Sequence, residues 1–244
     1  TGLPGQGPVR VGIPIADLTS GLLLAQAIMM ALLDREQTGK GQWVHTSLIE
    51  AMIFMLDFQA ARYLMKGDVA GQAGNDHPTS IPTGVFETSD GHINIAASGD
   101  VLWKRCCEAL DAGHLLKNEA YRTKALRSEN RVQLNQDLAA ITKTKPSDHW
   151  ITALNMAGVP CGPINSIDKT FAEPQVKHVG IARKVHHAEL GEYGVVGQPI
   201  NLSDAPQPEF LKPTPDTGQH SEEILADLGF STSDVAELRS KGVV

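Results

Sequence analysis

Cysteine is scarce in this chain, with three residues among 244. Two of the three, Cys106 and Cys107, are adjacent, so the set does not form the spaced framework of a disulfide-stapled secreted domain. We therefore expect reduced thiols and a cytoplasmic location. The adjacent pair is expected to pack in a core. Cys161 has no visible base partner in the sequence, and we predict a structural role for it as well.

Positive charge is also in short supply. The 21 lysines and arginines are outnumbered by 28 acidic residues, which gives a formal net charge of −7. No basic stripe is present that could neutralise phosphates, so we expect no nucleic-acid partner. A content of 41% hydrophobic and 20% charged residues is that of an ordinary soluble globular protein, and the length fits one or two domains.

Long apolar runs are missing too. The longest, Leu22–Leu33, contains Gln26 and is shorter than the roughly 20 residues that cross a bilayer as a helix. No signal peptide is recognisable, and the sequence predicts no membrane partner. The chain opens with TGLPGQGPVR and has no initiating Met, so we expect a piece of a longer protein whose upstream part is missing.

Patterns that bind metals or phosphates are equally absent. His186 and His187 are adjacent on a predicted strand, so their side chains point to opposite faces, and no metal site is predicted. The turn TGKGQ at 38–42 follows a helix and precedes a strand, which is the reverse of the context of a phosphate loop.

What the chain does contain is an alternation of strand and helix signals. After an apolar, strand-like run at 9–13, we predict a helix that begins at Thr19 or Ser20 and ends at Thr38-Gly39. It is apolar almost all round, which is typical of a buried helix. A short strand at 43–47 and a second long helix at 49–66 follow. This order indicates an α/β fold.

The rest of the chain has clear turn and loop signals between its predicted helices and strands. The stretch 69–83 has no periodicity and is rich in Gly and Pro, so we predict a loop there. Two alternating runs about Ser89-Asp90-Gly91 predict a hairpin over 84–97, and a second hairpin is predicted over 181–198. Further helices are predicted at 101–110, 129–141, 147–157, 221–228 and 233–241.

Asp17 is the residue of most interest, because it lies between the strand-like run and the first long helix. A helix that begins at Thr19 or Ser20 would direct its free backbone N–H groups toward this carboxylate. Such a position suits an ionised nucleophile. It equally suits a helix cap or a solvated loop carboxylate, and the spacing alone leaves these alternatives open.

Several segments resemble, in family order, the class III CoA-transferases, the family of formyl-CoA transferase, carnitine CoA-transferase and α-methylacyl-CoA racemase. The segments are IADLTSG (15–21), TGKGQ (38–42), GNDHP (74–78), GVFETSDGHINIA (84–96), AGVPCGPI (157–164), GQPINLS (197–203) and GQHSEEILADLGFS (218–231), followed by ELRSKGVV at the end. Together they cover nearly the whole chain.

The resemblance implies a particular architecture. A large Rossmann-like domain, incomplete because its N-terminal half is missing, would comprise residues 1–67 and 197–244. A smaller α+β domain would comprise residues 68–196. Family members form interlocked homodimers, so a homodimer is expected here too.

The resemblance also implies a chemistry. The aspartate that matches Asp17 attacks an acyl-CoA thioester, and the CoA group then passes to a carboxylic acid. Coenzyme A enters as the thioester substrate, and no permanently bound cofactor is implied. Two alternatives stay open. One is an acyl-CoA racemase of the same fold, with the matching Asp as one base and an upstream His as the other. The other is a non-catalytic or truncated homologue.

Four further residues are implied in binding the CoA ester. Leu48 matches a family position that lines the CoA pocket, although an ordinary core residue is the alternative. Gly74, Asn75 and His77 belong to the GNDHP loop, which takes the place of a glycine run that covers the active site in formyl-CoA transferase. This departure argues against the formyl and oxalate substrate pair, whereas a lid that excludes water remains expected. A plain interdomain linker is the alternative.

Overall fold

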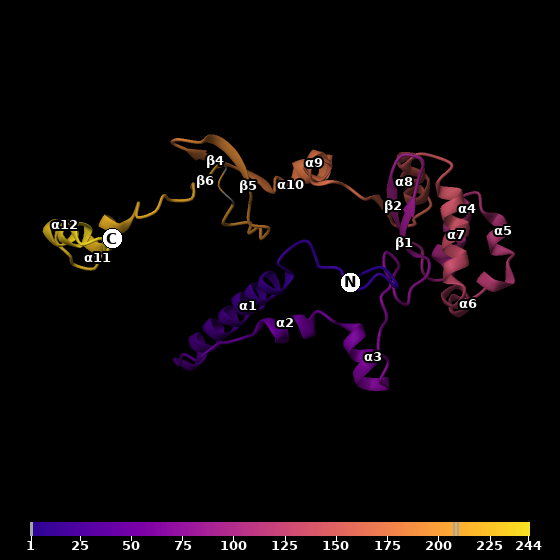
Figure 1. Cartoon of the computed structure of the whole chain (residues 1–244), viewed down its shortest axis with the longest axis horizontal. Coiled ribbons are helices and arrows are strands. Elements are labelled where there is room, and N and C mark those ends of the chain that lie inside the picture. The colour runs from indigo at the N-terminus through magenta and orange to yellow at the C-terminus, as the bar shows by residue number, and fades with distance from the viewer. Residues whose placement is uncertain (1, 207, 209) are drawn as a thin grey trace. The chain divides into compact units, whose positions relative to one another are not determined.

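The structure is a computed structural model that describes residues 2–206, 208 and 210–244. The chain divides into two compact units, residues 1–164 and 165–244, whose elements are labelled in Figure 1. Each unit combines helices with a three-stranded sheet, so the predicted α/β class is confirmed. The Rossmann-like layout with its domain bounds, and the homodimer, stay predictions.

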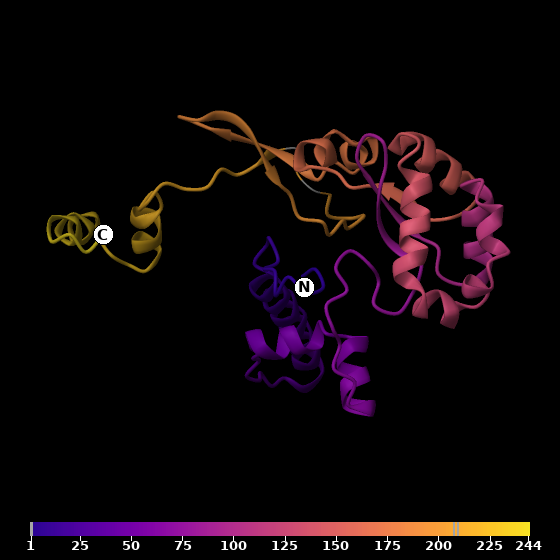
Figure 2. The same cartoon turned by 45° about the vertical axis from the view of Figure 1, so that its right-hand side comes forward.

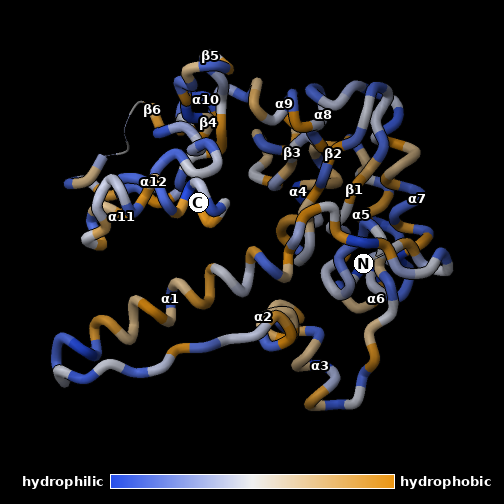
Figure 3. Tube along the Cα trace, turned by 60° about the vertical axis from the view of Figure 1, so that its left-hand side comes forward, coloured by the Kyte–Doolittle hydropathy of each residue, from blue (hydrophilic) through white to orange (hydrophobic). Residues whose placement is uncertain are grey.

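Three helices open the first unit: α1 (Ile15–Thr38), α2 (Leu48–Phe54) and α3 (Phe58–Lys66). Helix α1 ends as predicted at Gly39, which adopts a φ of 67° and donates its N–H to the carbonyl of Arg35. The chain then runs back along α1 in an extended stretch, and α2 lies against α1 (Figures 2 and 3).

The predicted start of α1 is wrong. The helix begins at Ile15, and Asp17 lies inside its first turn. The reason is Pro14, whose fixed φ of −74° suits the residue before a helix and whose carbonyl accepts the N–H of Leu18. Thr19 and Ser20 are therefore helical, and the hydroxyl of Ser20 donates back to the carbonyl of Ala16.

The strands predicted ahead of Asp17 and at 43–47 are also wrong, because neither stretch forms a β-strand among the described residues. A strand exists only through its ladder of hydrogen bonds to a neighbour. The single helix predicted at 49–66 is broken in two at Met55–Asp57. Asp57 there has a φ of 49°, which no helical residue adopts.

Helix α1 is exposed rather than buried, contrary to prediction. Thr19 is its one buried residue, whereas Leu22 and Leu33 are 74% and 64% exposed. The helix has the length and composition to cross a membrane, with 24 residues and a hydropathy of 1.7. It exceeds the apolar run Leu22–Leu33 because less apolar turns extend it at both ends.

A small sheet and a helical layer form the core of the first unit. Strands β1 (Thr83–Glu87) and β2 (His92–Ala96) make the predicted hairpin, with Phe86 opposite Ile93, and β3 (Cys161–Pro163) extends it antiparallel to β2. The helices are α4 (Asp100–Ala109), α5 (Gly113–Leu116), the 3₁₀ turn η1 (Glu119–Tyr121), α6 (Lys124–Glu129), α7 (Arg131–Thr142) and α8 (Ser147–Met156). The predictions for α4, α7 and α8 are confirmed to within two residues.

Period-2 alternation explains how this sheet meets its helices. Ile93 and Ile95 are fully buried on one face of β2, against Trp103 of α4 and Leu154 of α8. Cys106 and Cys107 lie in the same core, as predicted. Burial raises the pKa of the Cys107 thiol to about 12 and that of Cys161 to about 11. These thiols are therefore protonated at neutral pH and unsuited to nucleophilic work.

The second unit is smaller. Strands β4 (Ala182–His187) and β5 (Gly191–Val196) confirm the second predicted hairpin, and β6 (Phe210–Leu211) pairs in parallel with β4. The other elements are α9 (Ile167–Ala172), α10 (Pro174–Val179), α11 (Ser221–Asp227) and α12 (Thr232–Ser240). The last two confirm the predicted terminal helices, and Ser231 and Asp234 form a capping box at the start of α12.

Candidate functional site

Asp17 is solvent-exposed on the first turn of α1. The N–H of Ile15 donates to the carbonyl of Ile13 at 2.8 Å, and the N-cap residue Pro14 has no side chain that caps the other N–H groups of this turn. They place positive potential beside the carboxylate, which favours negative charge in this region. The geometry differs in detail from the predicted one, because the carboxylate lies within the turn rather than ahead of it.

Leu48 is the first residue of α2 and is 53% exposed, so it is not buried in the described structure. Ser47 caps the helix by accepting the N–H of Glu50 at 3.2 Å. Helices α1 and α2 contact each other, and each has one buried residue, Thr19 on α1 and Ala51 on α2. Both side chains are small, as is typical where helices approach closely. Asp17 and Leu48 each lie within one turn of these residues.

The GNDHP loop is docked on the edge of β1. The N–H of His77 donates to the carbonyl of Thr83 at 2.8 Å, and that of Val85 donates to the carbonyl of Asn75 at 3.2 Å. Gly84 permits this approach, because a Cβ there would lie 2.8 Å from Oδ1 of Asp76. The loop is thus a structured element rather than a plain linker.

Gly74 ties the loop to the segment that leads toward Asp17. It has a φ of 62° and donates its N–H to the carbonyl of Gly2 at 3.1 Å. The side-chain amide of Gln72 donates to the carbonyl of Gly7 at 2.6 Å. The chain ahead of α1 therefore lies against the loop, as Figure 1 also shows.

His77 is the fourth of the five residues of the loop. Its Nδ1 accepts the N–H groups of Thr79, at 3.1 Å, and Ser80, at 2.9 Å. Its ring stacks on Phe58 of α3, with centroids 5.7 Å apart and planes 12° from parallel. Since Nδ1 accepts, the proton of the neutral ring is on Nε2.

Two residues that the sequence did not single out complete this arrangement. Phe58 supplies the stacking partner, and Arg131 of α7 donates from Nη2 to the carbonyl of Pro78 at 3.0 Å. Burial raises the pKa of Asp76, and a hydrogen bond with Asn135 and the charge of Arg131 lower it by less. Neither residue lies in a recognisable motif, and the contact of Arg131 spans 53 residues.

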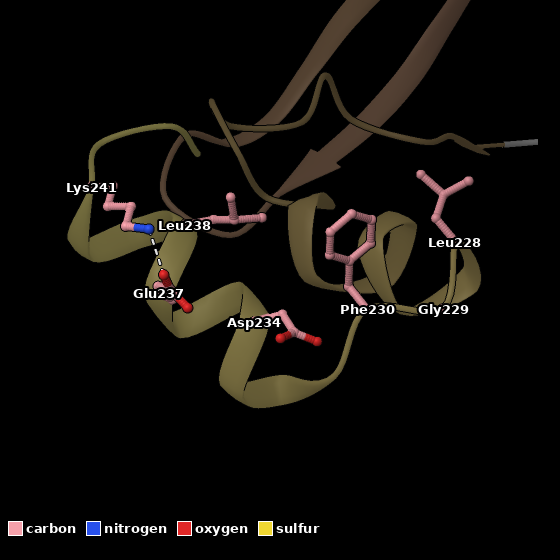
Figure 4. Close-up of a pocket in the computed structure, with 7 residues that line it drawn as sticks. All are labelled: Leu228, Gly229, Phe230, Asp234, Glu237, Leu238 and Lys241. Carbon is pink, nitrogen blue, oxygen red and sulfur yellow. Dashed lines mark hydrogen bonds and ion pairs between the residues drawn. The ribbon is translucent and has the colours of Figure 1, made fainter.

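Two cavities lined by described residues lie away from the GNDHP loop. One of about 510 Å³ lies between α12 and the turn that follows α11 in the second unit (Figure 4). Its lining is Leu228, Gly229, Phe230, Asp234, Glu237, Leu238 and Lys241. Another, of about 280 Å³, follows the C-terminal half of α1 from Ile28 to Arg35. In the described part of the chain, no three His, Cys, Asp or Glu side chains are arranged to hold a metal ion.

Comparison with known proteins identifies the family. The model of CoA-transferase family III matches residues 1–221. The chain belongs to this family. It is 34% identical to human succinyl-CoA:glutarate CoA-transferase over its whole length. It is 31% identical to succinate–glutarate CoA-transferase of Agrobacterium fabrum over 93% of its length.

A solved structure supports the same assignment. The crystal structure of a CaiB/BaiF family protein from Brucella suis matches 93% of the chain with a TM-score of 0.76 and 34% identity. The chain spans 56% of the human protein, 57% of the Agrobacterium protein and 59% of the Brucella chain. The segment that matches the family model, residues 1–221, contains both Asp17 and the GNDHP loop.

Proposed function

We propose that the protein transfers coenzyme A from an acyl-CoA donor to a carboxylate acceptor through a covalent intermediate on Asp17. Membership of CoA-transferase family III carries the proposal, together with the exposed carboxylate on the first turn of α1. Both relatives described above are named for CoA transfer between dicarboxylic acids. We therefore propose succinyl-CoA as the donor class and a dicarboxylate such as glutarate as the acceptor.

The mechanism uses the carboxylate twice. An oxygen of Asp17 attacks the thioester carbonyl, the C–S bond breaks, and a mixed anhydride and CoA thiolate form. The thiolate then attacks the Asp17 carbonyl of the anhydride and releases the donor acid as a carboxylate. The acceptor carboxylate attacks the resulting aspartyl thioester, giving a second anhydride and thiolate. The thiolate finally attacks the acceptor carbonyl, which yields the new thioester and free Asp17.

The groups around Asp17 have distinct roles in this proposal. The N–H groups at the start of α1 favour the negative charge on Asp17 and on the oxyanions that form from it. Leu48 lies on the neighbouring helix, at a position suited to apolar contact with the CoA ester. Gly74, Asn75 and His77 form a loop that shields the anhydride and the aspartyl thioester from water, since hydrolysis would waste both.

Trapping of the intermediate tests the proposal. The full protein is incubated with succinyl-CoA, quenched with hydroxylamine or reduced with borohydride, and its peptides are analysed by mass spectrometry. We expect a modification on the peptide that contains Asp17, and transfer reduced by roughly 10⁴-fold in Asp17→Asn. Asp34→Asn is the matched control, because Asp34 is an exposed carboxylate on the same helix.

The racemase alternative gives a different result. Exchange of solvent deuterium into the α-carbon of a branched acyl-CoA, without any adduct on Asp17, would contradict the nucleophile assignment.

A further inference from the structure

His77 of the GNDHP loop contacts both the residues that directly follow the loop and an aromatic ring on α3. His77 is half-buried, and its Nδ1 accepts two backbone N–H groups, those of Thr79 and Ser80. These two contacts close the turn that follows Pro78. The stacked ring of Phe58 fixes the plane of the imidazole and thereby the direction in which Nδ1 points.

The surroundings connect this turn to the region of Asp17. Phe58 is the first residue of α3, which follows α2 after the three-residue break, and α2 lies against α1. On its other side the loop contacts the segment ahead of α1 through Gly74 and Gln72. The loop therefore contacts the segment ahead of α1 through Gly74 and helix α3 through His77.

We propose that His77 is the positioning residue of this loop, and that its Nδ1 acceptor holds residues 78–80 in the conformation that excludes water from the Asp17 intermediates. The inference rests on the proposed function. His77 acts through the backbone of Thr79 and Ser80, and it takes no part in the bond changes at Asp17. The carbonyl of Pro78, held by Arg131, is the second anchor of the same turn.

The second unit offers a matched control. In the turn between β4 and β5, Nδ1 of His187 accepts the N–H groups of Glu189, at 3.2 Å, and Leu190, at 3.3 Å. The local pattern is the same as at His77, where the N–H donors also lie two and three residues after the histidine. No ring stacks on His187 among the described contacts. A substitution there removes an equivalent turn contact at a position with no proposed role.

Three variants of the full protein separate the possibilities. His77→Phe keeps an aromatic ring on Phe58 but removes the acceptor. His77→Asn places an amide oxygen near the position of Nδ1 and restores the acceptor. His187→Phe removes the acceptor of the control turn. Two quantities are measured for each: the ratio of CoA transfer to thioester hydrolysis, and the hydrogen–deuterium exchange of the peptide that contains Thr79 and Ser80.

We expect His77→Phe to exchange at Thr79 and Ser80 roughly tenfold faster, because two hydrogen bonds to these amides are lost. Its hydrolysis should rise relative to transfer, while the adduct on Asp17 still forms. His77→Asn should restore most of both quantities, and His187→Phe should change neither. An unchanged transfer-to-hydrolysis ratio in His77→Phe, or a His77→Asn variant as impaired as His77→Phe, would overturn the proposal.

The two readouts also separate this inference from the proposed function. If the unmodified protein forms no adduct and transfers no CoA, the proposed function fails. The water-shielding role then fails with it, and the exchange data alone report whether His77 holds the turn. If the adduct forms but His77→Phe leaves both exchange and hydrolysis unchanged, the inference alone fails.

Discussion

Oδ1 of Asp90, in the turn between β1 and β2, accepts the backbone N–H of Ser147 at 2.8 Å and its hydroxyl at 2.9 Å. A hairpin turn therefore caps helix α8 from a distance of 57 residues. The hydroxyl of Thr88 donates to the same oxygen. These donors, the N–H and hydroxyl of Ser147 first, lower the pKa of Asp90 below its usual value.

This relationship predicts an acid-sensitive contribution to stability. Because the folded pKa of Asp90 is lowered, its contribution is complete above the unfolded value near 3.8 and is lost as the pH falls through the folded pKa. Asp90→Asn should therefore be less stable than the unmodified protein at pH 7, and the difference should shrink as the pH falls below the unfolded value of 3.8. Urea unfolding at several pH values measures it. Parallel stability curves across this range would contradict the prediction.

Asp76 should show the opposite dependence. Burial is the main influence on this carboxyl and raises its pKa, so the folded state binds its proton more tightly than the unfolded state does. Stability is then lost as the pH rises from the unfolded value toward the folded pKa. We expect Asp76→Asn to be as stable as the unmodified protein, or more so, at pH 7 and to lose this advantage below about pH 4. Thermal melts at both pH values check this.

Local signals in the sequence were sufficient for one part of the fold. The hairpin over β1 and β2 was predictable because Asp90-Gly91 favours a tight turn and the flanking runs alternate. The helices α4, α7 and α8 were also predictable from their local sequence, to within two residues at each end. In these segments the local preference and the tertiary packing agree.

Other features depend on partners far away in the sequence. Residues 43–47 have the composition of a strand but form none here, because a strand needs a neighbour to pair with. Asp17 could be selected by its motif, whereas Phe58 and Arg131 could not. Their contacts with the GNDHP loop arise only when α3 and α7 are brought to it.

Arg127 provides a test of the core of the first unit. The side chain is fully buried, donates from Nη2 to Asp100 at 2.7 Å and from Nη1 to the carbonyl of Tyr121 at 3.0 Å, and lies over the ring of Trp103. Arg127→Ala should cost about 3–5 kcal/mol, since it leaves a cavity and an unpaired carbonyl. Asp100→Asn should cost about 1 kcal/mol or less, because that carboxylate is 77% exposed and water replaces it. Equal costs in urea unfolding would show that the ion pair, not the burial of Arg127, is what matters.

Gly84 makes the docking of the GNDHP loop testable without changing the loop itself. A Cβ at this position would lie 2.8 Å from Oδ1 of Asp76 and 2.9 Å from the carbonyl oxygen of Asn75, which is closer than real contacts allow. Gly84→Ala should therefore push the loop away from β1 and speed amide exchange at His77, whose N–H bonds Thr83. Gly162→Ala on β3 is the control, because a Cβ there meets nothing within 4 Å. If amide exchange at His77 in both variants matches that of the unmodified protein, the conformation of the loop does not depend on its contact with β1. If Gly84→Ala alone exchanges faster and also hydrolyses more thioester, loop docking and water exclusion are linked.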